Sequence, residues 1–249
     1  MKAKSGALSI FYERDGRPGS LPVLLVHGLS YTSKDWAAAA QALGADREVI
    51  RMDMRGFGES DWSPEKDYSV PSTAQDIIAV LDAAGCRRAV LAGHSMGGRS
   101  ATWAAAKNPD RVAGLVLIDY TPENAPAGTK RTAERVVSTP DRFKRDPFFR
   151  EQFKRMLETG ERPKLGVDMW QAIGEVRCPI LSMRGARSDM YAAETVQKMK
   201  AANPRLQVVE IPDAGHDIAG DNPSELVSAF DRWNRAVLPE RADHEHTGH

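Results

Sequence analysis

This chain of 249 residues has few cysteines, no excess of charge of one sign and no long apolar runs. Its two cysteines, Cys86 and Cys178, lie far apart and lack metal-ligand spacing, which excludes a disulfide framework and favours a reducing compartment. Because 34 basic residues balance 34 acidic ones, nucleic acid and anionic membrane surfaces are not expected partners. Apolar runs are far shorter than a membrane span, and no signal-peptide core follows the first lysines. We therefore expect a cytoplasmic protein whose partner is a small molecule.

Short apolar runs alternate with helical patterns along most of the chain. Several of these runs are unbroken, which is typical of strands buried on both faces of a sheet. They are Val23–His27, Val49–Asp53, Ala89–His94, Leu115–Asp119, Ile180–Arg184 and Val208–Ile211. Helical periodicity appears between them over Ser72–Ala84, Met96–Lys107 and Pro223–Val237. The pattern predicts an α/β fold with a doubly wound, mostly parallel sheet, which the antiparallel strand Ala7–Arg14 enters at its edge.

Residues 121–177 interrupt this alternation because they contain no good strand. Phe149, Phe153 and Met156 fall on one helical face there, which favours folded helices over a long loop. We predict that residues 121–177 form a small helical cap, inserted before the last two strands. Residues 1–120 and 178–240 would form the core, and the polar, His-rich residues 241–249 a disordered tail.

The most informative motif is Gly93-His94-Ser95-Met96-Gly97-Gly98. It follows a predicted buried strand and opens a predicted helix, which is the context of a nucleophile elbow. Glycines at positions 93 and 97 let neighbouring backbone pass close to a sharp turn. Such a turn holds the Ser95 hydroxyl out of the sheet at the positive end of the helix, so we predict Ser95 as a nucleophile.

A serine nucleophile needs a base and a carboxylate that orients the base. His216 follows the last predicted strand and so emerges at the same sheet edge as Ser95. In the chain order Ser, Asp, His, Asp119 ends one predicted strand and Asp189 follows the next, and both reach this edge. We favour Asp189, because its glycine-containing loop lets the side chain fold back toward His216. Asp217 is expected to be solvated.

An acyl-transfer intermediate also needs hydrogen-bond donors for its oxyanion. The backbone N–H of Met96 would supply one, and that of Leu29, in the loop after the strand Val23–His27, the other. His27 itself is expected to pack under this loop. The predicted substrate-binding residues are Tyr31, Phe143, Phe149, Phe153 and Trp170. Such residues suit an uncharged substrate with a hydrophobic part. Arg99 either lies on the helix surface or contacts an acidic group of the substrate.

Taken together, these landmarks resemble the α/β-hydrolase family over nearly the whole chain. They are His27-Gly28, Asp53–Ser60, Gly93–Gly98, the Asp189 loop and Gly215-His216-Asp217. The elbow followed by Arg99, and the segment Asp119–Pro122, are similar to small bacterial esterases of the YbfF type. The resemblance implies a triad of Ser95, Asp189 and His216, an oxyanion hole at Leu29 and Met96, and a scaffold role for Asp53–Ser60, with Arg55 paired to carboxylates.

The hypothesis that follows is hydrolysis of carboxylic esters, or lactones, of small to medium apolar substrates through an acyl-enzyme at Ser95. This chemistry requires no metal ion and no organic cofactor. The same triad also fits a carbon–carbon bond hydrolase of ring-cleavage products or a cofactor-free perhydrolase. A non-catalytic ligand receptor of the same fold is a further alternative, because fold alone does not determine function. Haloalkane dehalogenases and epoxide hydrolases carry aspartate at the elbow, so Ser95 argues against both.

Overall fold

The computed structural model describes residues 1–18, 21–123, 126–161 and 165–238. Its strands are β1 (Lys2–Ser5), β2 (Leu8–Gly16), β3 (Val23–Val26), β4 (Glu48–Met52), β5 (Ala89–His94), β6 (Val112–Ile118), β7 (Ile180–Gly185) and β8 (Leu206–Ile211). Its helices are the 3-10 helix η1 (Ser33–Trp36), α1 (Ala37–Leu43), α2 (Val70–Ala83), α3 (Met96–Lys107), α4 (Pro126–Ser138), α5 (Pro147–Thr159), α6 (Met169–Glu175), α7 (Ala193–Ala202), α8 (Ile218–Asp221) and α9 (Pro223–Val237).

The strands form one sheet in the order β1-β2-β4-β3-β5-β6-β7-β8. Strands β3 to β8 are parallel, and β1 and β2 join antiparallel at one edge. This confirms the predicted α/β class and the antiparallel entry strand. Since the central strands are parallel, the loops that follow β3, β5, β6, β7 and β8 meet at one edge of the sheet.

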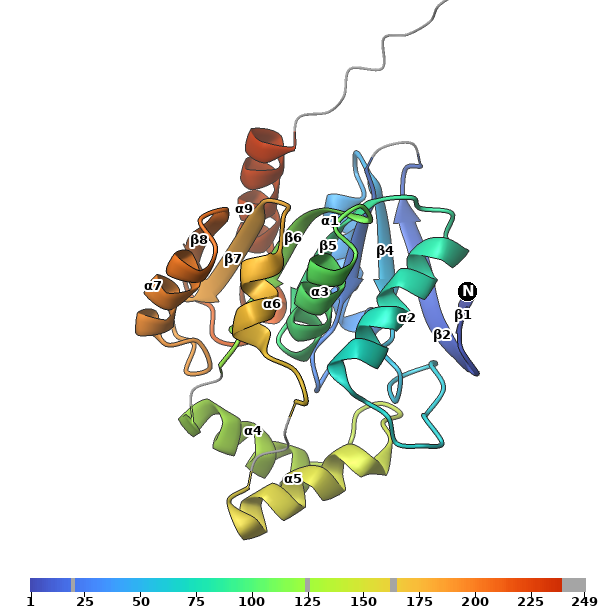
Figure 1. Ribbon diagram of the computed structural model, residues 1–249, viewed down its shortest axis with the longest axis vertical. Helices are drawn as coiled ribbons and strands as arrows, with labels where there is room; N and C mark the ends of the chain where they lie inside the picture. Colours follow the sequence, from blue (N-terminus) through green and yellow to red (C-terminus); the bar gives the residue numbers. More distant parts are fainter. Residues whose placement is uncertain (19–20, 124–125, 162–164, 239–249) are drawn as a thin grey trace, which may run out of the picture.

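Helices cover both faces of the sheet (Figure 1). One apolar core joins the sheet to α2, α3, α6 and α7, and a second joins its other face to α1, α8 and α9. Strands β3 and β6 are buried along their whole length, which explains why their sequences are apolar without alternation. The two covered faces leave the carboxyl edge as the place where loops and side chains can assemble a site.

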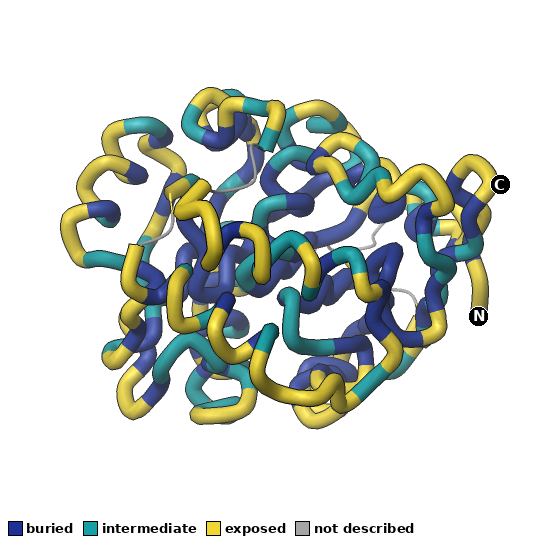
Figure 2. The backbone as a smooth tube through the Cα atoms, turned by 90° about the horizontal axis from the view of Figure 1, so that it is seen from below, coloured by how far each residue is buried: buried dark blue, intermediate teal, exposed yellow. Residues whose placement is uncertain are grey.

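Helices α4 and α5 lie beyond one end of the sheet, away from the layers on its faces (Figure 1). The segment between them is bonded to the loop after β4: Gly58 N–H donates to Lys144 O at 2.7 Å, and Asp146 N–H donates to Gly56 O at 2.8 Å. These contacts place α4 and α5 at the carboxyl edge. Viewed from this end, exposed chain surrounds a buried middle (Figure 2).

The stretch predicted as a cap therefore contains two different parts. Helices α4 and α5 pack on each other at the carboxyl edge, whereas α6 packs on α3 within a sheet-covering layer. The division into a core and a cap over residues 121–177 stays a prediction. The predicted tail, residues 241–249, lies outside the described residues.

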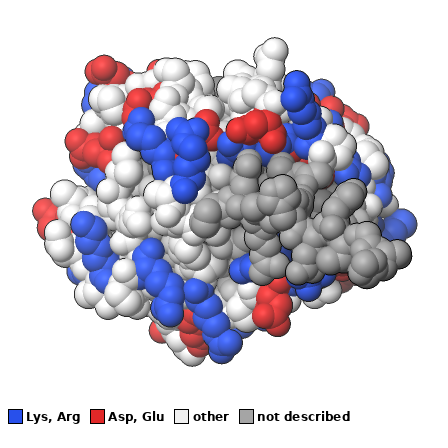
Figure 3. Space-filling model, turned by 90° about the horizontal axis from the view of Figure 1, so that it is seen from above, with Lys and Arg blue, Asp and Glu red and all other residues white. Residues whose placement is uncertain are grey.

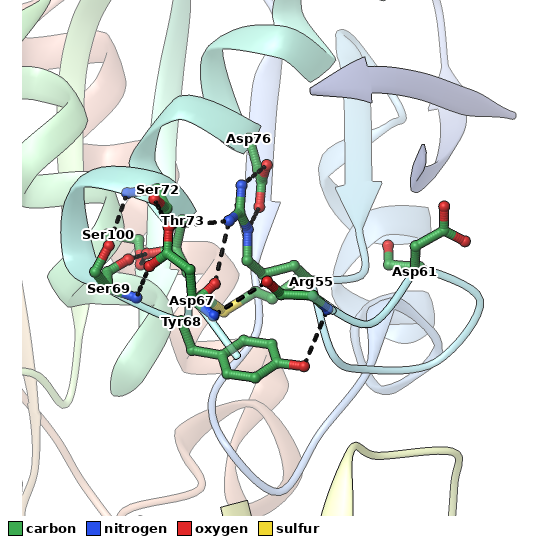
Figure 4. Close-up of polar contacts among 12 residues, drawn as sticks. Arg55, Asp61, Asp67, Tyr68, Ser69, Ser72, Thr73, Asp76 and Ser100 are labelled. Carbon is green, nitrogen blue, oxygen red and sulfur yellow. Dashed lines mark hydrogen bonds and ion pairs between the residues drawn. The ribbon is translucent and has the colours of Figure 1, made fainter. Parts of the chain in front are cut away.

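The loop after β4 is held by buried charge. Arg55 pairs through two nitrogens with both carboxylate oxygens of Asp76 on α2, at 2.6 and 2.7 Å (Figure 4). Asp53 accepts from Ser33 N–H at 2.6 Å and Glu59 N–H at 2.8 Å. Paired, fully hydrogen-bonded charges of this kind fix loop geometry, which agrees with the scaffold role expected for Asp53–Ser60.

None of the described helices is both long and apolar enough to cross a membrane. On the end of the molecule away from α4 and α5, basic and acidic side chains are interspersed over the surface that is not grey (Figure 3).

Candidate active site

Ser95 occupies a strained turn between β5 and α3. Its backbone has φ 51° and ψ −114°, a left-handed conformation that is uncommon outside glycine. A Cβ at Gly93 would lie 2.5 Å from Gly97 O, and a Cβ at Gly97 would lie 2.4 Å from Val26 O. The two glycines are therefore needed for close backbone approach, as the sequence predicted, and the turn presents Ser95 half-buried at the carboxyl edge.

His216 lies between Ser95 and a carboxylate. The Ser95 hydroxyl oxygen is 3.1 Å from His216 Nε2, and His216 Nδ1 is 2.7 Å from Asp119 Oδ2. Because a carboxylate only accepts, Nδ1 carries the proton and Nε2 is free to accept from Ser95. The three side chains come from the ends of β5, β6 and β8, which parallel pairing brings to one edge.

Asp119, not Asp189, is the carboxylate that contacts His216. The prediction that Asp189 orients the base was therefore wrong. The Asp189 side chain is 40% exposed and pairs with Arg131 on α4 at 2.6 Å. Asp119 is fully buried, and its φ of 45° turns it toward His216. The loop after β7 instead supports Asp119, because Gly185 N–H and the Ser188 hydroxyl donate to it at 3.0 and 2.5 Å.

The loop after β3 lies directly against Ser95. A Cβ added to Gly28 would be 3.2 Å from the Cβ of Ser95. His27 fixes this loop from below: its Nδ1–H donates to Gly28 O at 2.7 Å, and its Nε2 accepts from Met54 N–H at 2.9 Å. Burial lowers the pKa of His27, so it stays neutral in this structural role.

The two predicted oxyanion donors are the N–H groups of Leu29 and Met96. Within the described parts of the chain, the Leu29 N–H donates no hydrogen bond. Met96 is the first residue of α3, so its N–H has no intrahelical acceptor. Both amides are thus available as donors. Their use by an oxyanion stays a prediction.

His94 is a part of the site that the sequence did not reveal. Its Nε2–H donates to His216 O at 2.8 Å, and the two rings lie 4.7 Å apart. Burial, and next the neighbouring His216, hold the pKa of His94 well below its usual range. A neutral His94 therefore positions the His216 backbone without adding charge. Only its place inside the elbow motif could have signalled this role.

A pocket of about 340 Å³ lies beside these residues. Its lining comprises Ser30, Tyr31, Arg135, Val136, Thr139, Pro140, Asp141, Arg142, Phe143, Arg145 and Asp217. Ser30 follows Leu29 in the chain and Asp217 follows His216, while the Tyr31 ring is 5.1 Å from that of His94. The pocket therefore lies next to the oxyanion loop and the loop of His216, and Asp217 belongs to its wall, but neither Ser95 nor His216 is among its lining residues.

The predicted substrate-binding aromatics divide into two groups. Tyr31 and Phe143 line the pocket. Phe149 instead packs against Phe57 and Tyr68, with ring centroids 4.7 and 4.6 Å away. Half-buried Phe153 on α5 and Trp170 on α6 are also not among the lining residues. The lining is more charged than expected, because α4 and the segment after it contribute three arginines and one aspartate beside Phe143.

Arg99 lies on α3, one turn after Ser95, and is half-buried rather than on the helix surface. Burial lowers its pKa, and its side chain forms no hydrogen bond or ion pair with any other described residue, whereas its backbone N–H donates to Ser95 O at 3.2 Å. No group of three or more His, Cys, Asp or Glu side chains in the described ranges is arranged to hold a metal ion.

Comparison with known proteins agrees with this geometry. The model of the alpha/beta hydrolase family matches residues 23–230. The 3-hydroxybutyrate-oligomer hydrolase of Cupriavidus necator is 26% identical over 90% of this chain and 92% of its own length. Esterase YbfF of Escherichia coli is 39% identical over 41% of this chain and 39% of its own.

A thermophilic esterase from Thermogutta terrifontis, whose structure is described with malate bound, has a similar fold. It is 29% identical, with a TM-score of 0.73, and the match covers 95% of this chain and 98% of that one. Since the family model spans most of the sequence and the sheet and flanking helices agree, the chain belongs to the alpha/beta hydrolase family, as the motifs around Ser95 and His216 predicted.

Proposed function

We propose that this protein is a serine hydrolase that cleaves carboxylic esters through an acyl-enzyme at Ser95. The observation that carries the proposal is the continuous contact from the Ser95 hydroxyl through His216 to buried Asp119. Similarity to esterase YbfF and to the Thermogutta terrifontis esterase supports the proposal of ester hydrolysis.

In the first half-reaction, Ser95 Oγ attacks the ester carbonyl carbon while its proton passes to His216 Nε2. The N–H groups of Leu29 and Met96 stabilise the oxyanion. Nε2 then gives the proton to the departing alkoxide as the carbon–oxygen bond breaks, which leaves an acyl group on Ser95. Asp119 stabilises the imidazolium that exists between these two transfers.

In the second half-reaction, His216 Nε2 takes a proton from water, and the resulting hydroxide attacks the acyl carbon. The proton returns to Ser95 Oγ as the acid leaves. His94 keeps the His216 backbone in place throughout, by its hydrogen bond to the carbonyl. This places His94 as a positioning residue, since it contacts neither Ser95 nor Asp119 by a hydrogen bond.

The test is hydrolysis of p-nitrophenyl esters from acetate to decanoate, with wild type beside Ser95→Ala. We expect wild-type turnover and a loss of at least about a thousandfold in kcat for the variant, with unchanged circular dichroism. Near-normal turnover by Ser95→Ala would contradict the proposal. So would absence of wild-type ester hydrolysis in a folded sample that cleaves a vinylogous diketone.

A further inference from the structure

The pocket beside Ser95 and His216 has a net positive lining. Three arginines and two aspartates line it: Arg135, Arg142, Arg145, Asp141 and Asp217. Three positive charges against two negative ones leave an excess of one positive charge. A concave, partly desolvated surface concentrates such an excess, because fewer waters screen it than on an open face.

Two of the arginines already have acidic partners. Arg142 lies 3.5 Å from Asp35, and Arg145 pairs with Asp141, which Arg150 also approaches at 3.4 Å. The Arg145 side chain is only 4% exposed, and its Nη1 points to Leu29 O at 3.5 Å. Arg145 therefore supports the wall of the pocket next to the oxyanion loop.

Even so, Arg145 adds to the positive character of the pocket. Its Nε is buried and has no hydrogen-bond partner among the described residues. Its single carboxylate partner, Asp141, is shared with Arg150, so the positive charge around Asp141 exceeds the negative charge.

Arg135 on α4 differs from both, because it forms no ion pair with any described residue. Its Nη2 donates to the Ser30 hydroxyl at 2.9 Å, which holds the guanidinium one residue beyond Leu29. Burial, and next the charge of Asp217, raise the pKa of Tyr31, while Arg135 opposes this rise. The exposed guanidinium therefore lies between the hydroxyls of Ser30 and Tyr31, and no carboxylate of a described residue pairs with it.

We propose that Arg135 binds a carboxylate of the substrate, so that the hydrolase acts on esters whose acyl part carries a second, ionised carboxyl group. This inference rests on the function proposed above and names its substrate class. The planar guanidinium offers two parallel donors that match the two oxygens of a carboxylate. A carboxylate is preferred over a dianionic phosphate because the lining has an excess of only one charge.

The location of Arg135 also sets the spacing in the substrate. A carboxylate on Arg135 lies beside Ser30, and the ester carbonyl lies at the N–H of Leu29, the preceding residue. Because Ser30 and Leu29 are consecutive and their Cα atoms are about 3.8 Å apart, we choose a short spacer of roughly two to four carbons for the test. On this inference the substrate differs from the uncharged, hydrophobic one that the aromatic residues led us to expect.

The experiment compares two esters that differ only in charge. Monomethyl glutarate carries a carboxylate, and methyl 5-oxohexanoate has a methyl group in place of one carboxylate oxygen. The enzymes are wild type, Arg135→Gln and the matched control Arg131→Gln. Arg131 lies one turn earlier on α4 and pairs with Asp189, and neither of these two residues lines the pocket. Acid release is followed in a pH-stat.

For wild type we expect kcat/KM to be 10- to 100-fold higher with the charged ester, which is about 1.4 to 2.7 kcal/mol of binding. Arg135→Gln should abolish this preference mainly by raising KM for the charged ester. Arg131→Gln should match wild type on both esters. Equal losses on both esters in Arg135→Gln, or a wild type without preference, would overturn the inference.

A binding measurement separates this inference from the proposed function. Calorimetry with glutarate, the product acid, requires no turnover. Binding to wild type that Arg135→Gln weakens at least tenfold and Arg131→Gln does not would establish the carboxylate site even if neither ester were hydrolysed. Hydrolysis of both esters with glutarate affinity independent of Arg135 would overturn the inference while the proposed function stood.

Discussion

Replacing Asp119 with asparagine should stop catalysis while preserving the fold. In the structure, Asp119 Oδ1 accepts from Gly185 N–H at 3.0 Å, and Oδ2 accepts from His216 Nδ1 at 2.7 Å. The Gly185 amide can only donate, so the asparagine oxygen must stay on that side. Its NH₂ group then faces His216 Nδ1, which has to become an acceptor.

This reversal moves the histidine proton to Nε2. A protonated Nε2 donates and cannot accept the Ser95 proton, so the base is lost while the side chains remain in place. We expect kcat to fall by about 10³- to 10⁴-fold, equivalent to about 4 to 5.5 kcal/mol in the activation free energy. The Ser188 hydroxyl, which donates to Oδ2 at 2.5 Å, can rotate away and adds little to this loss.

The matched variant is Asp189→Asn, which applies the same change to the carboxylate that the sequence favoured. Its partner Arg131 is 57% exposed, and exposed pairs contribute only about 0 to 1 kcal/mol to stability. We expect kcat within about twofold of wild type for p-nitrophenyl acetate. The reasoning is refuted if Asp119→Asn stays within tenfold of wild type, or if Asp189→Asn loses a thousandfold.

Three further outcomes follow from the site. His94→Phe, which keeps the ring but removes the donor to His216 O, should lower kcat about tenfold at unchanged KM; an equal change in KM would indicate a general distortion instead. Burial keeps the pKa values of His27 and His94 below the ordinary value of about 6.5, so in acid the unfolded chain binds more protons than the folded one. The free energy of unfolding should therefore decrease as the pH is lowered past about 6.5, by up to ~1.4 kcal/mol per pH unit for each histidine. Urea unfolding from pH 7 to 5 measures this, and His94→Phe should have a shallower slope, with an identical slope excluding His94 as a contributor. Gly97→Ala should lower the free energy of unfolding by about 1 to 3 kcal/mol and also lower activity, because its Cβ would clash with the backbone carbonyls of Val26 and His27. The control Gly174→Ala, whose Cβ would lie 3.5 Å from Ala202 O, should lower neither.

The sheet, the nucleophile and the base were predictable because each depends on local sequence. Buried strands are apolar without alternation, and the elbow requires glycines at 93 and 97. His216 could be found because the last parallel strand delivers its loop to the same edge as Ser95. Each of these features is encoded in its own short segment of the sequence.

The acid and the pocket were harder to predict because they depend on how distant segments dock. Asp119 and Asp189 reach the same edge, but Asp119, whose φ is positive, contacts His216, whereas Asp189 pairs with Arg131. The position of α4 depends on Gly128, where a Cβ would lie 2.4 Å from Met190 Sδ. Nothing in the local sequence of α4 indicates that Arg135 would face Ser30.

The central claim is that Ser95 forms a covalent bond with its substrate. The most direct measurement is reaction with a fluorophosphonate, in which Ser95 Oγ bonds to phosphorus and fluoride leaves, followed by mass spectrometry of the digested protein. We predict one adduct on the peptide that contains Ser95 in wild type, none in Ser95→Ala, and much slower labelling in Asp119→Asn than in Asp189→Asn. An adduct on another residue, or equal labelling of Ser95→Ala, would contradict the account.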